Sequence, residues 1–413
     1  MRADVIVLGA GMVGVSCAVH LAKRGRAVVL VDRSGAGEET SFGNAGLIQR
    51  EGVVPYPFPR DLKTLARIAR NRSIDARYDP RALPRLAPFL ARYWWNSAPR
   101  RHAAIARAYA PLIEASLAEH DALAAEAGAT PLIRREGWMM VFRSPRALEA
   151  ALEQARLENR TFGIGFEALD PAGLAAREPH LTEGLAGGVH WTDPTTASDP
   201  GGVVKAYLGL FERLGGRFVR GDAADFAAEA GGWRAETEAG AVRAPAAVVA
   251  LGPWADDFSR RFGYRLPLAV KRGYHAHYRT RGNAGLNRPV LDAETGFALA
   301  PMRAGIRLTT GAEFAHRDAP KNPVQLDAAE RVARTLLPLA ERVEAEPWMG
   351  ARPVTPDMMP VIGPAPRHEG LWFAFGHAHH GFTLGPVTGR IIAAMVAGER
   401  PFLDAAPYRA DRF

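Results

Sequence analysis

The chain has 413 residues, of which 47% are hydrophobic and 23% are charged, and its formal net charge is +8. These proportions are ordinary for a packed soluble protein, and they exclude a disordered chain, a collagen-like chain and a coiled coil. The length exceeds what one hydrophobic core usually supports, so we expect two domains. The single cysteine, Cys17, excludes a disulfide framework and any cysteine-based zinc or iron–sulfur site.

The basic residues are 47 Arg and five Lys, and they are spread along the chain without a run of five like charges. Nucleic-acid binding would require a basic stripe with interleaved exposed aromatics, so we expect no nucleic-acid partner. No apolar stretch reaches the roughly 18 residues of a membrane span. Asp4 interrupts the basic start that a secretory signal requires, which predicts a cytoplasmic protein.

The predicted elements begin with a β-α-β unit over residues 4–32, made of two all-apolar strands around a glycine turn and a helix. The following helices are predicted over 60–70, 84–96, 101–127 and 145–160, and strands near 137–142, 217–220, 233–237 and 246–251. A helix starts at Ser198-Asp-Pro200, and residues 266–279 alternate as a strand. The last elements are a helix from Asp327 to about 337, strands at 361–363 and 371–375, and a terminal helix over 386–397.

The glycine turn carries the strongest motif, Gly9-Ala-Gly11-Met-Val-Gly14, followed by Asp32 at the end of the next strand. Gly9 allows the tight turn, Gly11 lets the backbone approach a pyrophosphate, and Gly14 lets helix and strand pack closely. The helix N-terminus favours phosphate, and Asp32 can accept hydrogen bonds from an adenosine ribose. The motif therefore predicts a dinucleotide site, and Asp32 disfavours a 2′-phosphorylated cofactor.

The sequence after Asp32 favours FAD over NAD, because the pattern of alternating strands and helices stops there. The stretch Glu39-Thr-Ser-Phe-Gly-Asn-Ala-Gly46 replaces it, and its small polar residues can lie along an extended dinucleotide. Attachment of the flavin through cysteine is disfavoured because the only cysteine is in the first helix, so we expect FAD to be bound non-covalently.

These residues resemble a known family. The glycine motif, the 39–46 stretch, Val249-Ala-Leu-Gly-Pro-Trp254, and Gly350-Ala-Arg-Pro with the residues up to Gly363 are similar to FAD-dependent amino-acid oxidoreductases. The resemblance is to bacterial D-amino-acid dehydrogenases, with sarcosine and glycine oxidases and D-amino-acid oxidases as relatives, and it covers essentially the full chain. It implies an α/β fold with a discontinuous FAD-binding Rossmann-like domain of the glutathione-reductase type. That domain would comprise 1–50, 198–265 and 345–413, and an interleaved α+β substrate domain with an antiparallel sheet would comprise 51–197 and 266–344.

The resemblance also implies site residues. Arg352, in the Gly-x-Arg-Pro motif, would bind the substrate carboxylate, which a planar guanidinium does with two parallel bonds. Tyr274 is a candidate substrate contact, with packing at a sheet edge as the alternative, and His380 is a third candidate for the catalytic site. The expected cofactor-binding residues are Gly9, Gly11, Gly14, Asp32, Arg33, Thr40, Ser41, Asn44, Ala45, Gly46, Leu47, Gly252, Gly381, Phe382, Thr383 and Leu384. We expect no metal site, because the run of His377, His379 and His380 next to glycine is a poor frame for ligands.

The implied activity is oxidation of an amino acid, with D the expected configuration, to its imino acid by hydride transfer to flavin N5. The electrons would pass to a quinone or another acceptor, O₂ included. Two alternatives stay open: a secondary-amine oxidoreductase of the sarcosine, glycine or hydroxyproline type, and a non-catalytic or NAD-binding module. The Phe89–Trp95 segment is compatible with peripheral contact to the inner face of the cell membrane or with buried helix packing, and the Tyr56 loop with a lid or a plain connector.

Overall fold

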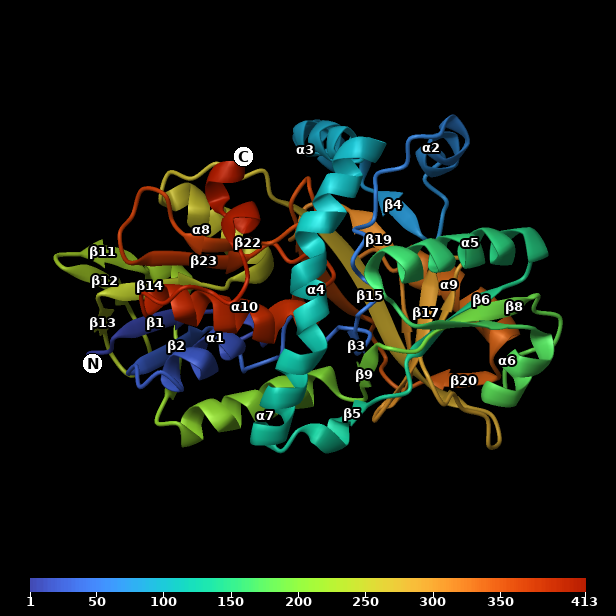
Figure 1. The fold of residues 1–413 in the computed structure, drawn as a ribbon, viewed down its shortest axis with the longest axis horizontal. Coiled ribbons are helices and arrows are strands. Elements are labelled where there is room, and N and C mark those ends of the chain that lie inside the picture. Colours follow the sequence, from blue (N-terminus) through green and yellow to red (C-terminus); the bar gives the residue numbers. More distant parts are fainter.

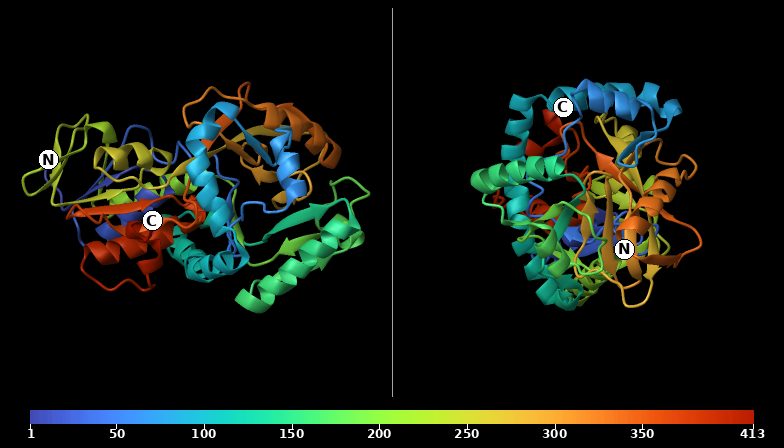
Figure 2. Two further views of the ribbon diagram at one scale, coloured as in Figure 1. Left: turned by 90° about the horizontal axis from the view of Figure 1, so that it is seen from above. Right: turned by 90° about the vertical axis from the view of Figure 1, so that its right-hand side faces the viewer.

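A computed structural model describes residues 1–413, and its two large β-sheets lie in separate lobes with the long helix α4 (Pro99–Ala127) running between them (Figure 1). Figure 2 shows the same two lobes from above, with the N-terminus in one and the green and orange strands of the larger sheet in the other. No helix is both long and apolar enough to cross a membrane.

The first lobe is built on a six-stranded sheet. Its order is β10 (Arg217–Arg220), β2 (Val28–Asp32), β1 (Val5–Leu8), β14 (Ala246–Val249), β23 (Leu371–Phe375) and β22 (Val361–Pro364). All neighbouring pairs are parallel except β22 with β23. Both faces are covered, which explains why these strands read as continuous apolar runs rather than alternating ones.

The two faces of this sheet have different covers. Val5 and Val7 pack into the larger core, with α1 (Met12–Ala22), α7 (Pro200–Arg213), α10 (Gly381–Val396) and α4. Ile6 and Leu8 face a second core of aromatic side chains. That second core lies under the small sheet of β11 (Ala227–Glu229), β12 (Gly232–Ala235) and β13 (Val242–Ala244), together with α8 (Ala255–Arg261).

The second lobe holds an eleven-stranded, mainly antiparallel sheet. Its path is β4 (Ala76–Tyr78), β19 (Ala312–Phe314), β15 (Ala269–Thr280), β18 (Gly305–Thr309), β17 (Phe297–Met302), β16 (Val290–Asp292), β6 (Trp138–Phe142), β8 (Gly187–Trp191) and β7 (Phe166–Leu169). Strands β20 (Leu339–Arg342) and β21 (Trp348–Val354) also pair with β15. The twelve-residue strand β15 is therefore the centre of this lobe. Its neighbour β21 contains Arg352.

The remaining elements complete the second lobe and the junction. The helices are α2 (Leu62–Ala69), α3 (Leu83–Asn96), α5 (Pro145–Phe162), α6 (Pro171–Arg177) and α9 (Val324–Leu336). A small sheet of β3 (Leu47–Ile48), β9 (Thr195–Ala197) and β5 (Ile133–Arg134) joins the end of the loop over residues 39–47 to the middle of the chain.

The predicted α/β fold is confirmed, with differences in detail. Helix α9 begins at Val324, so Asp327 lies in its first turn and is not its cap. Helix α10 begins at Gly381, before Pro386. A proline inside a helix leaves the carbonyl four residues earlier without a partner; that carbonyl, Phe382 O, lies 2.8 Å from His120 Nε2.

Two segments lie elsewhere than the predicted domain limits suggest. Helix α4, expected in the substrate domain, packs against α10 and α7 of the first lobe. Strand β21, expected in the FAD domain, pairs along its whole length with β15 of the second lobe. The exact division of the chain into two domains stays a prediction.

Candidate active site

One large cavity, of about 1450 Å³, connects the two lobes. It starts at the turn between β1 and α1, follows the loop over residues 39–47, and reaches the large sheet at β15 and β21. The cavity is thus lined at one end by the predicted dinucleotide motif and at the other by Arg352. An extended ligand is needed to fill such a shape.

At the first end, the glycines have the conformations that the motif requires. Gly9 has φ of +102°, and a Cβ on Gly14 would lie 1.7 Å from Gly9 O, so only glycine fits at both positions. Helix α1 begins after Gly11 with no side-chain cap, and Gly11 lines the cavity. Free N–H groups at a helix N-terminus are suited to a pyrophosphate.

Asp32 anchors the same turn. Its carboxylate accepts hydrogen bonds from Ala10 N at 2.6 Å and from Ser34 N at 2.8 Å. Burial raises the pKa of this carboxyl, although both bonds act to lower it. Asp32 and Arg33 line the cavity, and the Arg33 guanidinium lies 4.3 Å from the centre of the Trp254 ring.

The loop over residues 39–47 is held from three sides. Ser41 Oγ accepts from Met12 N at 2.9 Å, and Thr40 Oγ1 donates to Ala351 O at 3.0 Å. Arg307, which is 3% exposed, donates to the carbonyls of Phe42 and Asn44 at 2.8 and 2.5 Å. The loop is therefore fixed to the dinucleotide helix, to the strand of Arg352 and to the large sheet. Arg307 cannot be recognised from the sequence, because one arginine among 47 carries no local signal.

Most of the predicted cofactor residues line the cavity, and four do not. The lining ones are Gly9, Gly11, Asp32, Arg33, Thr40, Ser41, Asn44, Ala45, Leu47, Gly252, Gly381 and Phe382. Gly14 and Gly46 serve close backbone packing. Thr383 Oγ1 lies 3.2 Å from both Leu47 O and Gln49 N, and Leu384 is fully buried in the core, so neither residue lines the cavity.

Arg352 occupies the far end of the cavity. Its guanidinium lies over Gly273, where a Cβ would come within 2.7 Å of Nη2, and Nη1 donates to Gly311 O at 3.1 Å. Its hydrogen-bond partner is this carbonyl and not a carboxylate, and burial lowers its pKa. Arg352 is thus a positioned cation with donors left for an anionic ligand.

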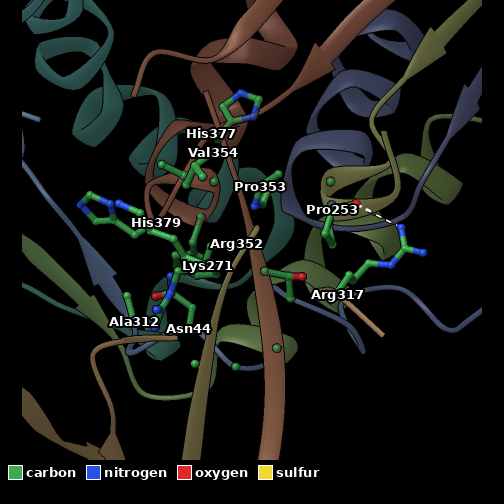
Figure 3. Close-up of a pocket in the computed structure, with 18 of the residues that line it drawn as sticks. Asn44, Pro253, Lys271, Ala312, Arg317, Arg352, Pro353, Val354, His377 and His379 are labelled. Atoms are coloured by element: carbon green, nitrogen blue, oxygen red, sulfur yellow. Dashed lines mark hydrogen bonds between the residues drawn. The ribbon is translucent and has the colours of Figure 1, made fainter. Parts of the chain in front are cut away.

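Lys271 lies beside Arg352 on the neighbouring strand (Figure 3). Its ammonium donates to Tyr93 Oη at 3.2 Å and lies 4.6 Å from the centre of the Tyr93 ring. Burial and the charge of Arg352 lower the pKa of Lys271 to about 7. Lys271 lies within the strand predicted over residues 266–279, and no local sequence signal distinguishes it as a site residue.

Comparison with known proteins identifies the family. The family described as "DAO: FAD dependent oxidoreductase" matches residues 4–395. The chain belongs to the FAD-dependent oxidoreductase family. It is 30% identical to a D-amino acid dehydrogenase of Chromohalobacter salexigens, over 99% of both chains, and 29% identical to a D-amino-acid oxidase of Bradyrhizobium diazoefficiens, over 99% of this chain and 98% of the other. Glycine oxidase from Geobacillus kaustophilus has a similar fold, with a TM-score of 0.75, 23% identity, and coverage of 100% of this chain and 99% of the other.

The residues of the cavity fit FAD, the cofactor of this family. The N-terminal end of α1, where Gly11 lines the cavity, suits the pyrophosphate, and Asp32 lies where an adenosine ribose would extend from it. At the other end, α10 begins at Gly381 without a side-chain cap, and Gly381 and Phe382 line the cavity. The positive end of that helix would stabilise negative charge on a reduced flavin.

Tyr274, the candidate substrate contact, is among the residues that line the cavity, but its hydroxyl is bonded within the protein. Its side chain is fully buried on the other face of β15, where its hydroxyl contacts Arg272 at 2.6 Å and Glu313 at 2.9 Å. The same hydroxyl accepts from Asn322 N. The Tyr274 hydroxyl therefore belongs to a buried ion-pair network that supports the strand, and Lys271 and Gly273 line the cavity from the other face of β15.

His380, the third candidate for the catalytic site, does not line the cavity. Its side chain points away from the cavity, with Nδ1 at 2.7 Å from the hydroxyl of Tyr109, and burial lowers its pKa to about 3. His379 lines the cavity instead, with its ring centre 5.0 Å from that of Tyr56. Burial, His380 and the two cations of the site lower the pKa of His379 well below its ordinary value, so its ring is neutral at pH 7.

Proposed function

We propose that this oxidoreductase oxidises a D-amino acid to its imino acid, which is then hydrolysed to the 2-oxo acid. The observation that carries the proposal is Arg352, a cation without a carboxylate partner that lies in the cofactor cavity. The names of the curated relatives, D-amino acid dehydrogenase and D-amino-acid oxidase, support the substrate class and the configuration.

The chain's own residues would bind and orient the substrate. Arg352 is fixed by its bond to Gly311 O and by the flat surface of Gly273, so its remaining donors can hold the α-carboxylate in one orientation. The buried cation Arg352 disfavours an ammonium group nearby, which favours the neutral amine that the reaction needs. Bound FAD supplies the hydride acceptor, its N5 atom.

The test is anaerobic bleaching of the bound flavin by matched D- and L-amino acids, with sarcosine and proline in the panel. We expect D-amino acids to bleach the flavin and their L-enantiomers not to. Arg352→Met should raise KM strongly while the flavin spectrum is unchanged, and Arg279→Met, an exposed arginine of β15, should leave KM unchanged. An unchanged KM in Arg352→Met would contradict the role of this residue. A preference for sarcosine or proline would replace the primary-amine assignment.

We also propose that the surface formed by α2, α3 and the start of α4 contacts an anionic membrane, where a quinone could take the electrons. Residues 60–101 contain eleven Lys and Arg against three Asp, and the rest of the chain has 41 of each sign, so this segment carries the whole net charge of +8. It also exposes Leu62, Trp94 and Trp95. Basic charge together with exposed indole rings is the pattern of peripheral binding to anionic lipid.

Cosedimentation with vesicles tests this surface. The protein should sediment with phosphatidylglycerol vesicles at low salt and remain free of phosphatidylcholine vesicles, and Trp94→Ser with Trp95→Ser should weaken binding. Equal behaviour with both lipids would contradict the proposal. Reduction of a soluble quinone under anaerobic conditions, compared with the rate of O₂ consumption, separates a dehydrogenase from an oxidase. The expected location is the cytoplasm and the inner face of the membrane.

A further inference from the structure

Two cations share the substrate end of the cavity, and no carboxylate pairs with either of them. We infer that the substrate carries a second carboxylate, so that Arg352 binds the α-carboxylate while Lys271 binds the side-chain carboxylate of an amino dicarboxylic acid. This inference rests on the proposed function and specifies its substrate class.

Strand pairing places the two groups within reach of one small molecule. Lys271 and Arg352 are direct Cα partners in the antiparallel pair of β15 and β21. Directly opposite residues have Cβ atoms about 5 Å apart, and their side chains leave the sheet on the same face. Gly273, two residues along β15, also lies on that face, and the Arg352 guanidinium lies over it, which keeps this charge close to the strand of Lys271.

The surroundings of Lys271 leave its charge without a counter-ion. The only polar partners of its ammonium are Tyr93 Oη at 3.2 Å and Met358 Sδ at 3.8 Å. Rings of Tyr93 and Phe314 lie 4.6 and 5.3 Å from Nζ. An aromatic wall tolerates a cation but does not neutralise it, and one of the three N–H donors is left over.

The charge balance then favours a dicarboxylate over a neutral amino acid. A neutral amino acid contributes one carboxylate to a site with two cations, which leaves Lys271 desolvated and unpaired. A second carboxylate pairs with it, and a hydrogen bond between charged groups is among the strong ones. The neutral amide analogues, glutamine and asparagine, have nearly the same shape and lack that charge.

The experiment compares D-glutamate with D-glutamine and D-aspartate with D-asparagine, by anaerobic flavin bleaching and by kcat/KM with a dye acceptor. The holoenzyme should prefer the acids, and Lys271→Met should lower kcat/KM for the acids about 30-fold while changing the amides less than about threefold. Lys271→Arg should keep the preference. Lys205→Met, an exposed lysine of α7, is the matched control and should behave as the wild type.

The outcomes separate the inference from the function that it specifies. The inference is wrong if the amides bleach the flavin as well as the acids do, or if Lys271→Met lowers kcat/KM equally for acids and amides. In either case Lys271 does not select a dicarboxylate, while the oxidation of amino acids stands. If no amino acid bleaches the flavin, the proposed function itself fails.

A binding measurement on the wild-type holoenzyme avoids any folding defect of a variant. Glutarate should perturb the flavin spectrum at a much lower concentration than butyrate does, and equal affinities would overturn the inference. Glutarate affinity should also fall as the pH rises through about 7, because Lys271 then loses its proton. The other groups that face it, namely Arg352, Tyr93, Tyr56 and His379, do not change charge near pH 7, since their pKa values are displaced or lie far from it.

Discussion

Gly273→Ala tests whether catalysis depends on the position of the Arg352 guanidinium. A Cβ at residue 273 would lie 2.7 Å from Nη2 and 2.9 Å from Cζ of Arg352. Carbon atoms in contact are normally separated by about 3.5 Å, so the guanidinium has to move by roughly 0.8 Å. The backbone of Gly273 is ordinary β-strand, and the group that must move is the end of a flexible side chain, so the fold should tolerate the change.

A misplacement of about 1 Å at a reacting centre can cost about 100-fold in rate, which corresponds to roughly 2.7 kcal/mol. We therefore expect Gly273→Ala to lower kcat/KM about 100-fold for every amino-acid substrate, while the flavin content and the thermal unfolding midpoint stay near those of the wild type. Gly285→Ala, where nothing lies within 4 Å of an added Cβ, is the control. A Gly273→Ala enzyme with wild-type kcat/KM and intact flavin would refute the view that this contact sets the orientation of Arg352.

Three further predictions concern the cofactor and stability. Gly14→Ala should give colourless protein, because its Cβ would lie 1.7 Å from Gly9 O, whereas Gly209→Ala on α7 should stay yellow; the absorbance at 450 nm checks both. Arg307→Met removes the donors to Phe42 O and Asn44 O, so the dissociation constant of FAD, measured by fluorescence, should rise about tenfold. Acid should destabilise the fold below pH 6.5, because burial keeps five histidines neutral in the folded protein, with pKa values between about 2 and 4, while the same histidines of the unfolded chain take up protons. The urea midpoint of unfolding should therefore fall steadily from pH 6.5 to pH 4. A midpoint that does not change over this pH range would contradict the prediction. The five histidines are His20, His120, His275, His377 and His380.

The parts of the site that the sequence predicts well are those set by local geometry. The glycine motif is readable because Gly9 and Gly14 lie five residues apart and their contact depends only on the turn between them. The alternation of β15 was also readable from the sequence, and it correctly placed the side chains of Tyr274 and His275 on opposite faces of the strand. Which of those two faces meets the cavity depends on the sheet's packing against distant helices, which no local pattern encodes, so the sequence leaves substrate contact and sheet packing both open for Tyr274.

The same distinction explains the histidines near the C-terminus. The helix was expected to start at Pro386, because proline is common in a first turn. It starts five residues earlier, and the carbonyl that Pro386 cannot bond lies within hydrogen-bonding distance of His120, which is more than 260 residues away. That shift turns His380 into the core and leaves His379 at the cavity. A contact across such a sequence distance cannot be inferred from either segment alone.

Strand β21 connects Arg352 to both the large sheet and the loop over residues 39–47. One side of this strand pairs with β15, whose far face is held by the buried ion pair of Arg272 and Glu313. Ala351, next to Arg352, accepts a hydrogen bond from Thr40 in the cofactor loop. Arg352 is thus tied both to the rigid sheet and to the loop that would lie along the flavin. Because both connections reach the same strand, a change that loosens the cofactor loop should also displace the substrate, and defects in FAD binding and in KM should appear together in variants of this loop.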